Sequence, residues 1–519
     1  MPVTPTFPGV FLDEIPGGSH PIDGAPTSIA AFVGWTARGP VEEPTATGSF
    51  GEFERLFGGL ATASMVSYAV RDFYRNGGAQ ALIVRLHNGA NAARIGLKTG
   101  GVAPNDELLL DAASVGVWGN GLNVLVDHNT TDTANTKLFN LTIIDSARAT
   151  EKWLNVSVDP SDPGFLPLVL KESSLLVTVP TDSSGQYIVP NLSPQDAPPV
   201  RPSTPGSDGS PLMPNSYGIA SDKTSKTGLF ALEKADLFSL LCIPPPIQGV
   251  DTSAAVYQAA LQYCVDRRAV LLVDPPAAWS AQAETAVSNA LAGVDALGLV
   301  GIEARNAALY FPLLVEADPH HDQQMNTFVP CGAVAGIIAR TDAQHGVWKA
   351  PAGIDAALYG IAALQVNLTD HQNGQLNPLA INCLRSFPAI GPVVWGARTL
   401  RGADQLGDEY KYVPVRRLGL FLEESVDRGT KWVVFEPNDE PLWAQIRLAV
   451  SSFMNDLFLK GAFQGSSPRE AYFVECGRQT TTQKDIDLGI VNIVVGFAPL
   501  MPAEFVIIQI RQLACQVCT

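Results

Sequence analysis

The chain has 519 residues, of which 46% are apolar and 16% charged, so most of it should bury a core and several domains are expected. It carries 34 Lys and Arg against 51 Asp and Glu, a formal charge of −17, which argues against a nucleic-acid binder because phosphate contacts need clustered basic residues. The first residues lack the basic and apolar regions of a signal peptide, and no apolar run reaches the roughly 20 residues of a membrane span.

The N-terminal stretch surrounds one short apolar run with prolines. Residues 10–15, with the sequence VFLDEI, read as a strand whose flanking prolines prevent a local hairpin. Residues 28–35 then read as a buried strand, residues 64–76 as a helix and residues 81–86 as a further strand. A strand, a helix and a strand in this order predict an α/β unit.

The pattern changes between about residue 100 and residue 225, where helical periodicity is weak. Short strand-like runs alternate with polar turns, at residues 108–110, 122–127, 138–144, 153–158 and 175–179. Residues 189–215 are dense in Pro, Ser, Asp and Gly and predict an exposed loop. We therefore expect an inserted β-rich domain.

The α/β pattern resumes after residue 225. Strands are expected at residues 236–243, 269–274 and 307–315, with helices at residues 252–267 and 280–297. Because the strands are apolar on both faces, they predict a sheet covered by helices on both sides.

The last third of the chain predicts a helix packed on a sheet. The helix should begin at Pro441 and end at Gly461, with apolar residues recurring every three or four positions. The expected strands are residues 431–435, 471–476 and 488–497, followed by a terminal strand at residues 505–510.

Few residues offer chemistry. His320, His321 and Asp322 invite a metal or general-base interpretation, but neighbouring side chains on an extended chain point to opposite faces, so a solvated loop is favoured. Cys515 and Cys518 form one CxxC without a second pair for zinc, and the seven scattered cysteines indicate a reducing compartment.

Catalytic motifs are also missing. The sequence has no G-x-S-x-G, no H-E-x-x-H and no phosphate-binding P-loop, and residues 116–121, GVWGNG, favour a turn before a strand over a dinucleotide site. We therefore expect no enzymatic activity, no catalytic or metal-binding residue and no cofactor. An α/β hydrolase with a β-rich accessory domain is the alternative from another functional class.

A mixed-charge segment precedes the last helix. Its residues suit either salt bridges between subunits or a solvated surface, where an exposed pair contributes only about 0 to 1 kcal/mol. They are Arg416, Arg417, Glu423, Glu424 and Arg428.

Longer stretches carry a family resemblance. Residues 382–399, NCLRSFPAIGPVVWGART, residues 424–446, ESVDRGTKWVVFEPNDEPLWAQI, and residues 461–510 strongly resemble the tail sheath family of contractile phages and injection particles. PGVFLDEIPGG, PTSIAAFVGWTARGP and VWGNGLNV in the first quarter agree with it. The sequence of the C-terminal motif resembles the sheaths of extracellular injection particles more than those of phage tails.

The resemblance implies an α/β and α+β multidomain fold. It would have a subtilisin-like α/β domain at residues 26–99 and 226–375, an inserted β-rich domain at residues 100–225, and a C-terminal α+β assembly domain at residues 376–500. Terminal arms, residues 1–25 and 501–519, would form strands.

It also implies a sheath of stacked subunit rings that contracts and drives an inner tube through a target envelope. The arms would add strands to neighbouring subunits, which suits apolar terminal strands. The arm residues expected to make these contacts are Val10, Phe11, Leu12, Ile15, Phe505, Ile507, Ile508 and Ile510.

The implied partners are further copies of the chain, the inner tube protein, and baseplate and cap proteins, with neither nucleic acid contact nor membrane insertion. Assembly would take place in a bacterial cytoplasm, before the subunit becomes part of a phage tail or a released particle. A related non-contractile tail or baseplate component is a further alternative.

Overall fold

The computed structural model describes residues 20–101, 107–132, 134–145, 149–221 and 223–505. The chain divides into two compact units. The sheet unit comprises residues 26–345 and 350–416, and the C-terminal unit comprises the residues up to 25, residues 346–349 and the residues from 417 onward.

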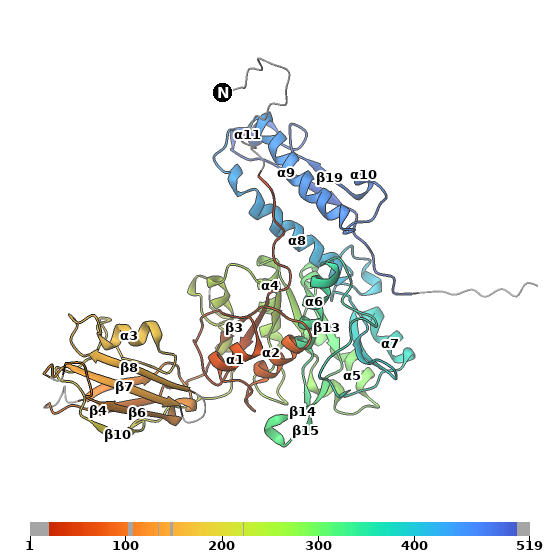
Figure 1. Ribbon diagram of the computed structural model, residues 1–519. Helices are drawn as coiled ribbons and strands as arrows, with labels where there is room; N and C mark the ends of the chain where they lie inside the picture. Colours follow the sequence, from red (N-terminus) through yellow and green to blue (C-terminus); the bar gives the residue numbers. More distant parts are fainter. Residues whose placement is uncertain (1–19, 102–106, 133, 146–148, 222, 506–519) are drawn as a thin grey trace, which may run out of the picture. The chain divides into compact units, whose positions relative to one another are not determined.

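An eight-stranded sheet forms the centre of the sheet unit, with strand order β18-β17-β13-β12-β11-β1-β3-β2 (Figure 1). The six inner strands run parallel and the two edge strands antiparallel. The strands are β1 (Ala30–Gly34), β2 (Thr45–Thr47), β3 (Ala81–Arg85), β11 (Leu240–Cys242), β12 (Val270–Val273), β13 (Ala307–Phe311), β17 (Ile381–Phe387) and β18 (Gly391–Val394).

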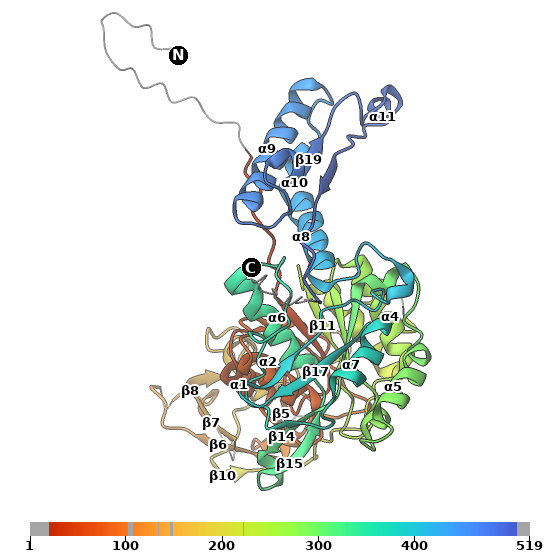
Figure 2. The same ribbon diagram turned by 90° about the vertical axis from the view of Figure 1, so that its right-hand side faces the viewer.

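Helices cover both faces of this sheet, as predicted (Figure 2). On one face, Phe32 of β1 meets Phe73 of α2 (Met65–Arg75) with ring centroids 5.5 Å apart. The thiol of Cys242 donates to the carbonyl of Cys331, 3.7 Å away, in α6 (Cys331–His345) on the same face. The other face shares its core with α4 (Ala254–Asp266) and α5 (Ala286–Gly293).

The inserted region is a pair of antiparallel sheets around one apolar core. One sheet has the order β4-β5-β9 and the other β10-β6-β7-β8. Their strands, with one helix, are β4 (Arg94–Lys98), β5 (Glu107–Ala112), β6 (Leu122–Asp127), β7 (Leu138–Asp145), β8 (Ala149–Ser157), α3 (Leu166–Ser173), β9 (Val177–Thr178) and β10 (Ala197–Val200). The prediction of an exposed loop at residues 189–215 was wrong in part, because this segment contains β10. Prolines are tolerated there because β10 is an edge strand.

Two connectors that lead into and out of this region run side by side. Bridges pair Asn88 with Gly209, Asn91 with Ser207 and Arg94 with Thr204. Beside them, the fully buried guanidinium of Arg85 donates to the carbonyls of Thr36 and Gly39, each 2.9 Å away, and to that of Val115 at 2.7 Å.

One predicted strand proved to be two. Residues 307–315 contain the whole of β13 and the start of a second strand, because Pro312 lies between them and lacks a backbone N–H. The second strand belongs to a separate small sheet formed by β14 (Leu314–Asp318), β15 (Gln324–Phe328) and β16 (Ala363–Leu364). Helices α1 (Phe50–Phe57) and α7 (Asp370–Leu376) complete the sheet unit.

The division between the units differs from the expected domain start at residue 376. Strands β17 and β18 lie in the large sheet, and the division falls after residue 416, inside α8 (Val413–Gly429). The segment 376–416 therefore belongs to the sheet unit.

The C-terminal unit is built on the predicted helix, α9 (Glu440–Leu459). Asp439 caps it, Pro441 lies in its first turn, and Trp443, Ile446 and Val450 are buried. The other elements are α10 (Pro468–Ala471), β19 (Tyr472–Glu475), α11 (Gln483–Asp487) and β20 (Val494–Phe497).

One strand prediction in this unit was wrong, and another was correct only in part. Lys431–Val433 forms a 3-10 turn, and Phe435 has a left-handed φ of 73° that a strand cannot accommodate. Of residues 488–497 only the last four form a strand, since Gly489 has a φ of 71°. Across the described residues, no helix is both long enough and apolar enough to span a lipid bilayer.

Candidate assembly surface

The two-stranded sheet of the C-terminal unit has one covered face and an open edge. Strand β19 pairs antiparallel with β20, from Tyr472 opposite Phe497 to Glu475 opposite Val494. Val474, Val495 and Phe497 pack against the core that contains α9. No described residue pairs with the outer edge of β19. A sheet of this size is marginal alone, and its free edge can accept another strand.

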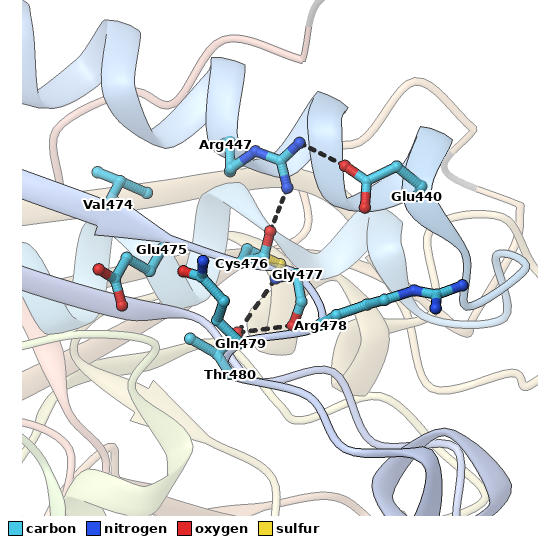
Figure 3. Close-up of a pocket in the computed structure, with 9 residues that line it drawn as sticks. All are labelled: Glu440, Arg447, Val474, Glu475, Cys476, Gly477, Arg478, Gln479 and Thr480. Carbon is cyan, nitrogen blue, oxygen red and sulfur yellow. Dashed lines mark hydrogen bonds and ion pairs between the residues drawn. The ribbon is translucent and has the colours of Figure 1, made fainter.

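A pocket of about 400 Å³ lies where β19 ends (Figure 3). The Arg447 guanidinium of α9 crosses it, donating to the carbonyl of Cys476 and, over 2.6 Å, to the Glu440 carboxylate. The hydroxyl of Thr480 accepts from the Gly477 N–H at 3.1 Å, which fixes the turn after the strand. Burial raises the pKa of the Cys476 thiol, which disfavours the thiolate that a nucleophile would need.

The N-terminal chain reaches the same unit. Ile22 packs into the core of the C-terminal unit, and the Ala25 N–H donates to the Ser425 hydroxyl over 3.0 Å. A Cβ at Gly429 would lie 2.6 Å from the Ile22 side chain, so glycine is required for this approach. Sequence reasoning missed this contact. Its only signal is that an apolar residue and a glycine, far apart in the chain, occupy complementary positions.

Most of the expected arm residues lie outside the residues that the structure describes. Val10, Phe11, Leu12, Ile15, Ile507, Ile508 and Ile510 all lie outside the described residues. Phe505, the last residue described, is exposed and in no strand. The arm contacts therefore stay predictions.

The expected charged contacts all lie on α8. Arg428 pairs with Glu424 one turn away, at 2.6 Å, and Glu423 is exposed. Arg416 donates to the Asn306 side chain at 3.0 Å and lies over the Tyr410 ring, while Arg417 is buried. Their role between subunits stays a prediction.

The histidine segment is bound into the fold. His321 Nδ1 is 2.6 Å from Asp318 Oδ2, and His320 Nε2 is 3.0 Å from the Leu60 carbonyl. Asp322 takes a left-handed φ of 51°. Within the described ranges, no three His, Cys, Asp or Glu side chains converge in a way that could hold one metal ion.

Within the part of the chain that the structure describes, a Ser-His-Asp hydrogen-bonded chain lies in the inserted region. Ser193 Oγ lies 3.1 Å from His128 Nε2, and His128 Nδ1 lies 2.6 Å from Asp196 Oδ1. The Asp196 side chain is 71% exposed, and the serine hydroxyl also donates to the Thr136 carbonyl at 2.8 Å. A hydrolase triad instead buries its aspartate and directs the serine proton to the imidazole. This arrangement ties a loop to the end of β6.

Comparisons with known proteins agree with the resemblance. Residues 230–400 match the family model described as the phage tail sheath protein central domain. The tail sheath protein of Vibrio phage KVP40 is 27% identical over 201 residues, 36% of this chain and 29% of that protein. The tail sheath protein of Enterobacteria phage T4 is 27% identical over 173 residues, 33% of this chain and 24% of that protein. The chain thus spans less than a third of the length of these curated relatives.

Solved structures show the fold over nearly the whole chain. The PVC sheath complex of an extracellular contractile injection system, in its contracted state, has a TM-score of 0.59 and 21% identity, covering 98% of this chain and 99% of that one. The contracted helical sheath of the anti-feeding prophage has a TM-score of 0.55 and 23% identity, with 98% and 100% covered. The sheath tail protein of Listeria innocua has a TM-score of 0.59 and 14% identity, with 92% and 96% covered. The resemblance to the tail sheath family is confirmed, as a mixed α/β multidomain fold.

Proposed function

Since residues 230–400 match the phage tail sheath central domain and the chain has the fold of sheath subunits, we propose that it polymerises into a contractile sheath. In this proposal, stacked rings of the chain surround an inner tube, and their contraction drives the tube through a target envelope. The agreement in fold over 98% of the chain with contracted sheaths is the observation that carries it.

Strand addition would join the copies. The open edge of β19 offers unpaired backbone groups, and the apolar arm runs at residues 10–15 and 505–510 supply candidate strands. Each main-chain hydrogen bond contributes about 0.5 to 1.5 kcal/mol net, so an arm that makes about four of them adds several kcal/mol per link. The arms would tether neighbours while the unit bodies move rigidly.

The finer domain assignments belong to the same proposal. The parallel sheet with helices on both faces would be the subtilisin-like domain, residues 100–225 the inserted β-rich domain, and the C-terminal unit the assembly domain. This role needs no enzymatic activity.

The partners would be further copies, the inner tube, and baseplate and cap proteins. The setting would be the bacterial cytoplasm and then a released particle. The fold match to the PVC sheath of an extracellular contractile injection system supports an injection particle over a phage tail.

Electron microscopy of the purified full-length chain tests the proposal against two variants. One variant lacks residues 1–18. The other keeps the full length but replaces Val10, Phe11, Leu12 and Ile15 with serine, which separates strand formation from arm length. We expect hollow helical tubes from the full chain and dispersed particles from both variants, with unchanged circular dichroism. Dispersed full-length protein, even with the inner tube protein present, would contradict the sheath role.

A further inference from the structure

Three charged side chains are buried together between α2 and β14. Arg71 Nε donates to Asp72 Oδ1 over 2.9 Å, and Arg71 Nη2 donates to Glu316 Oε2. The three residues are only 1 to 2% exposed. One guanidinium therefore faces two carboxyl groups away from water.

This group cannot be fully ionised without leaving a negative charge unbalanced. Arg75 Nη1 lies 3.9 Å from Glu316 Oε2, but its side chain is 47% exposed, so water screens its contribution. A buried unpaired charge costs several kcal/mol, and such groups usually neutralise by binding a proton. Asp72 Oδ2 and Glu316 Oε1 also have no hydrogen-bond partner when both carboxyl groups are ionised.

We propose that Arg71, Asp72 and Glu316 form a binding site for one proton, which the Glu316 carboxyl group holds and donates to the Asp72 carboxylate. The protonated pair and the guanidinium then sum to zero charge. The shared proton also gives both orphaned oxygens a partner.

The electrostatics of the two carboxyl groups support this assignment. Burial, followed by the facing Asp72 charge, raises the pKa of Glu316 to about 9, against the opposing effect of Arg71. Burial also raises the pKa of Asp72, but Arg71 and a hydrogen bond with Glu316 counteract it. Glu316 is thus the proton carrier and Asp72 the acceptor.

The surrounding elements contribute few other titratable groups. Asp318, next along β14, receives hydrogen bonds from His321 and from Tyr68 of α2, which lower its pKa to about 2 although burial opposes them. Strands β15 and β16 contain no titratable side chain. On α6, Arg340 donates to the Ala357 carbonyl at 2.8 Å, and Asp342 accepts from Thr27 at 2.7 Å.

The proton ties the small sheet to the large one, because β14 pairs with β15 and α2 packs on β1. Glu316 in the unfolded chain has an ordinary pKa near 4.5, whereas in the fold it is raised. The stabilisation is therefore complete below about pH 4.5 and is lost as pH rises through about 9. Within this window, local opening should increase up to tenfold per pH unit.

Hydrogen exchange of the full chain between pH 6 and pH 9 tests the predicted pH dependence of local opening. The quantity compared is the ratio of the protection factors of wild type and Glu316→Gln, for the amides of β14 and β15. Glutamine keeps the shape and an N–H donor for Asp72 but cannot ionise. Taking the ratio at each pH removes the intrinsic pH dependence of exchange. We expect the variant to gain protection over wild type by up to tenfold per pH unit, while Glu54→Gln, at an exposed position of α1, shows a constant ratio.

A second variant covers the case in which Glu316→Gln does not fold. With Asp72→Asn the second negative charge is gone, Glu316 ionises against Arg71, and the pH dependence of β15 protection should flatten in the same way. A wild-type to Glu316→Gln ratio that stays constant from pH 6 to pH 9 would overturn the proposal, as would an unchanged pH dependence in Asp72→Asn.

Discussion

A second buried carboxyl group caps a helix at the carboxyl end of the large sheet. Asp274 follows β12, and its Oδ1 accepts from the Cys331 N–H, 2.9 Å away, at the first residue of α6. Burial raises the pKa of Asp274 to about 7. The cap is therefore neutral in acid and becomes a buried charge above neutral pH.

Asp274→Asn should remove a pH dependence from the stability of the sheet unit. Because the pKa of Asp274 is raised from 3.8 to about 7 in the fold, its stabilisation is complete below pH 4 and is lost as pH rises through 7. The amide keeps the acceptor for Cys331 but cannot ionise. We expect the variant to gain about 1.4 kcal/mol per pH unit relative to wild type across this window.

Urea denaturation of both proteins at pH 4, 5.5 and 7 measures this difference. Subtracting the two curves cancels every other titrating group, including Glu316. Asp295→Asn, at an exposed position of the 3-10 turn Asp295–Leu297, is the control and should give parallel curves. Parallel curves for Asp274→Asn as well would show that Asp274 stays ionised in the fold.

Phe435 adopts a backbone conformation that a bulky side chain disfavours. Its φ is 73° and its side chain is fully exposed, so a bulky residue adopts left-handed backbone without any burial in return. Such conformations cost roughly 1 to 3 kcal/mol and persist where the surroundings impose them. Here the Glu436 N–H donates to the Val433 carbonyl, over 3.1 Å, and Asn438 donates to the Ile490 carbonyl, over 3.0 Å.

Phe435→Gly should therefore stabilise the isolated subunit, by about 1 kcal/mol, because glycine adopts this φ freely and no packing is lost. Val434→Gly is the matched control, since the neighbouring valine is also exposed but has an ordinary φ of −65°, so glycine there should destabilise. Chemical denaturation followed by tryptophan fluorescence distinguishes the two directions. Destabilisation by Phe435→Gly would mean that the ring makes a contact worth more than the strain.

At the level of elements, α2 and α6 approach each other through glycine. A Cβ at Gly332 would lie 2.0 Å from the Ala69 carbonyl oxygen, and one at Gly336 would lie 2.5 Å from that of Phe73. Backbone atoms cannot yield as a flexible side chain does. The two helices can lie this close only because both positions lack a side chain.

Gly332→Ala should push α6 away from α2 and destabilise the sheet unit by about 1 to 3 kcal/mol, despite the better helix propensity of alanine. Gly374→Ala in α7 is the control, because a Cβ there meets no atom within 4 Å and should be neutral or slightly stabilising. Thermal unfolding of the two variants compares them directly. Equal midpoints would contradict the close contact.

These elements show how far the sequence alone reaches. Strong periodicity predicted α9 and its buried face, and continuous apolar runs predicted β1, β3 and β12. The same rules missed α6, because CGAVAGIIA is apolar on all sides and its helical stripe is invisible when the helix is buried all round. The open edge of β19 could not be predicted either, because a strand's own sequence does not show whether another strand pairs with it.

The chain as a whole carries a formal charge of −17. Copies of the chain therefore repel one another, and this repulsion opposes their association. Raising ionic strength shortens the screening length from about 30 Å at 0.01 M to about 3 Å at 1 M. If copies assemble through apolar strand addition, polymer should therefore increase with salt. Sedimentation of the full chain in 0.05 M and 0.5 M sodium chloride measures the pelleted fraction, which should rise.

The serine-arm variant separates this effect from salting-out, because it keeps the same charge and should stay in the supernatant at both concentrations. A pelleted fraction of wild type that falls with salt would indicate that ion pairs, such as those expected of Arg416 and Glu423, hold the copies together instead.

The paired connectors of the inserted region give the chain a natural splice point. Since Asn88 and Asn91 lie directly beside Gly209 and Ser207, a short glycine link could join the two sides without moving β3 or β11, both of which pair with β1. Arg85 would lose only its bond to the Val115 carbonyl and keep those to Thr36 and Gly39. The same splice point could receive a foreign domain whose own termini lie close together, which makes the subunit a carrier for displaying other proteins in regular array.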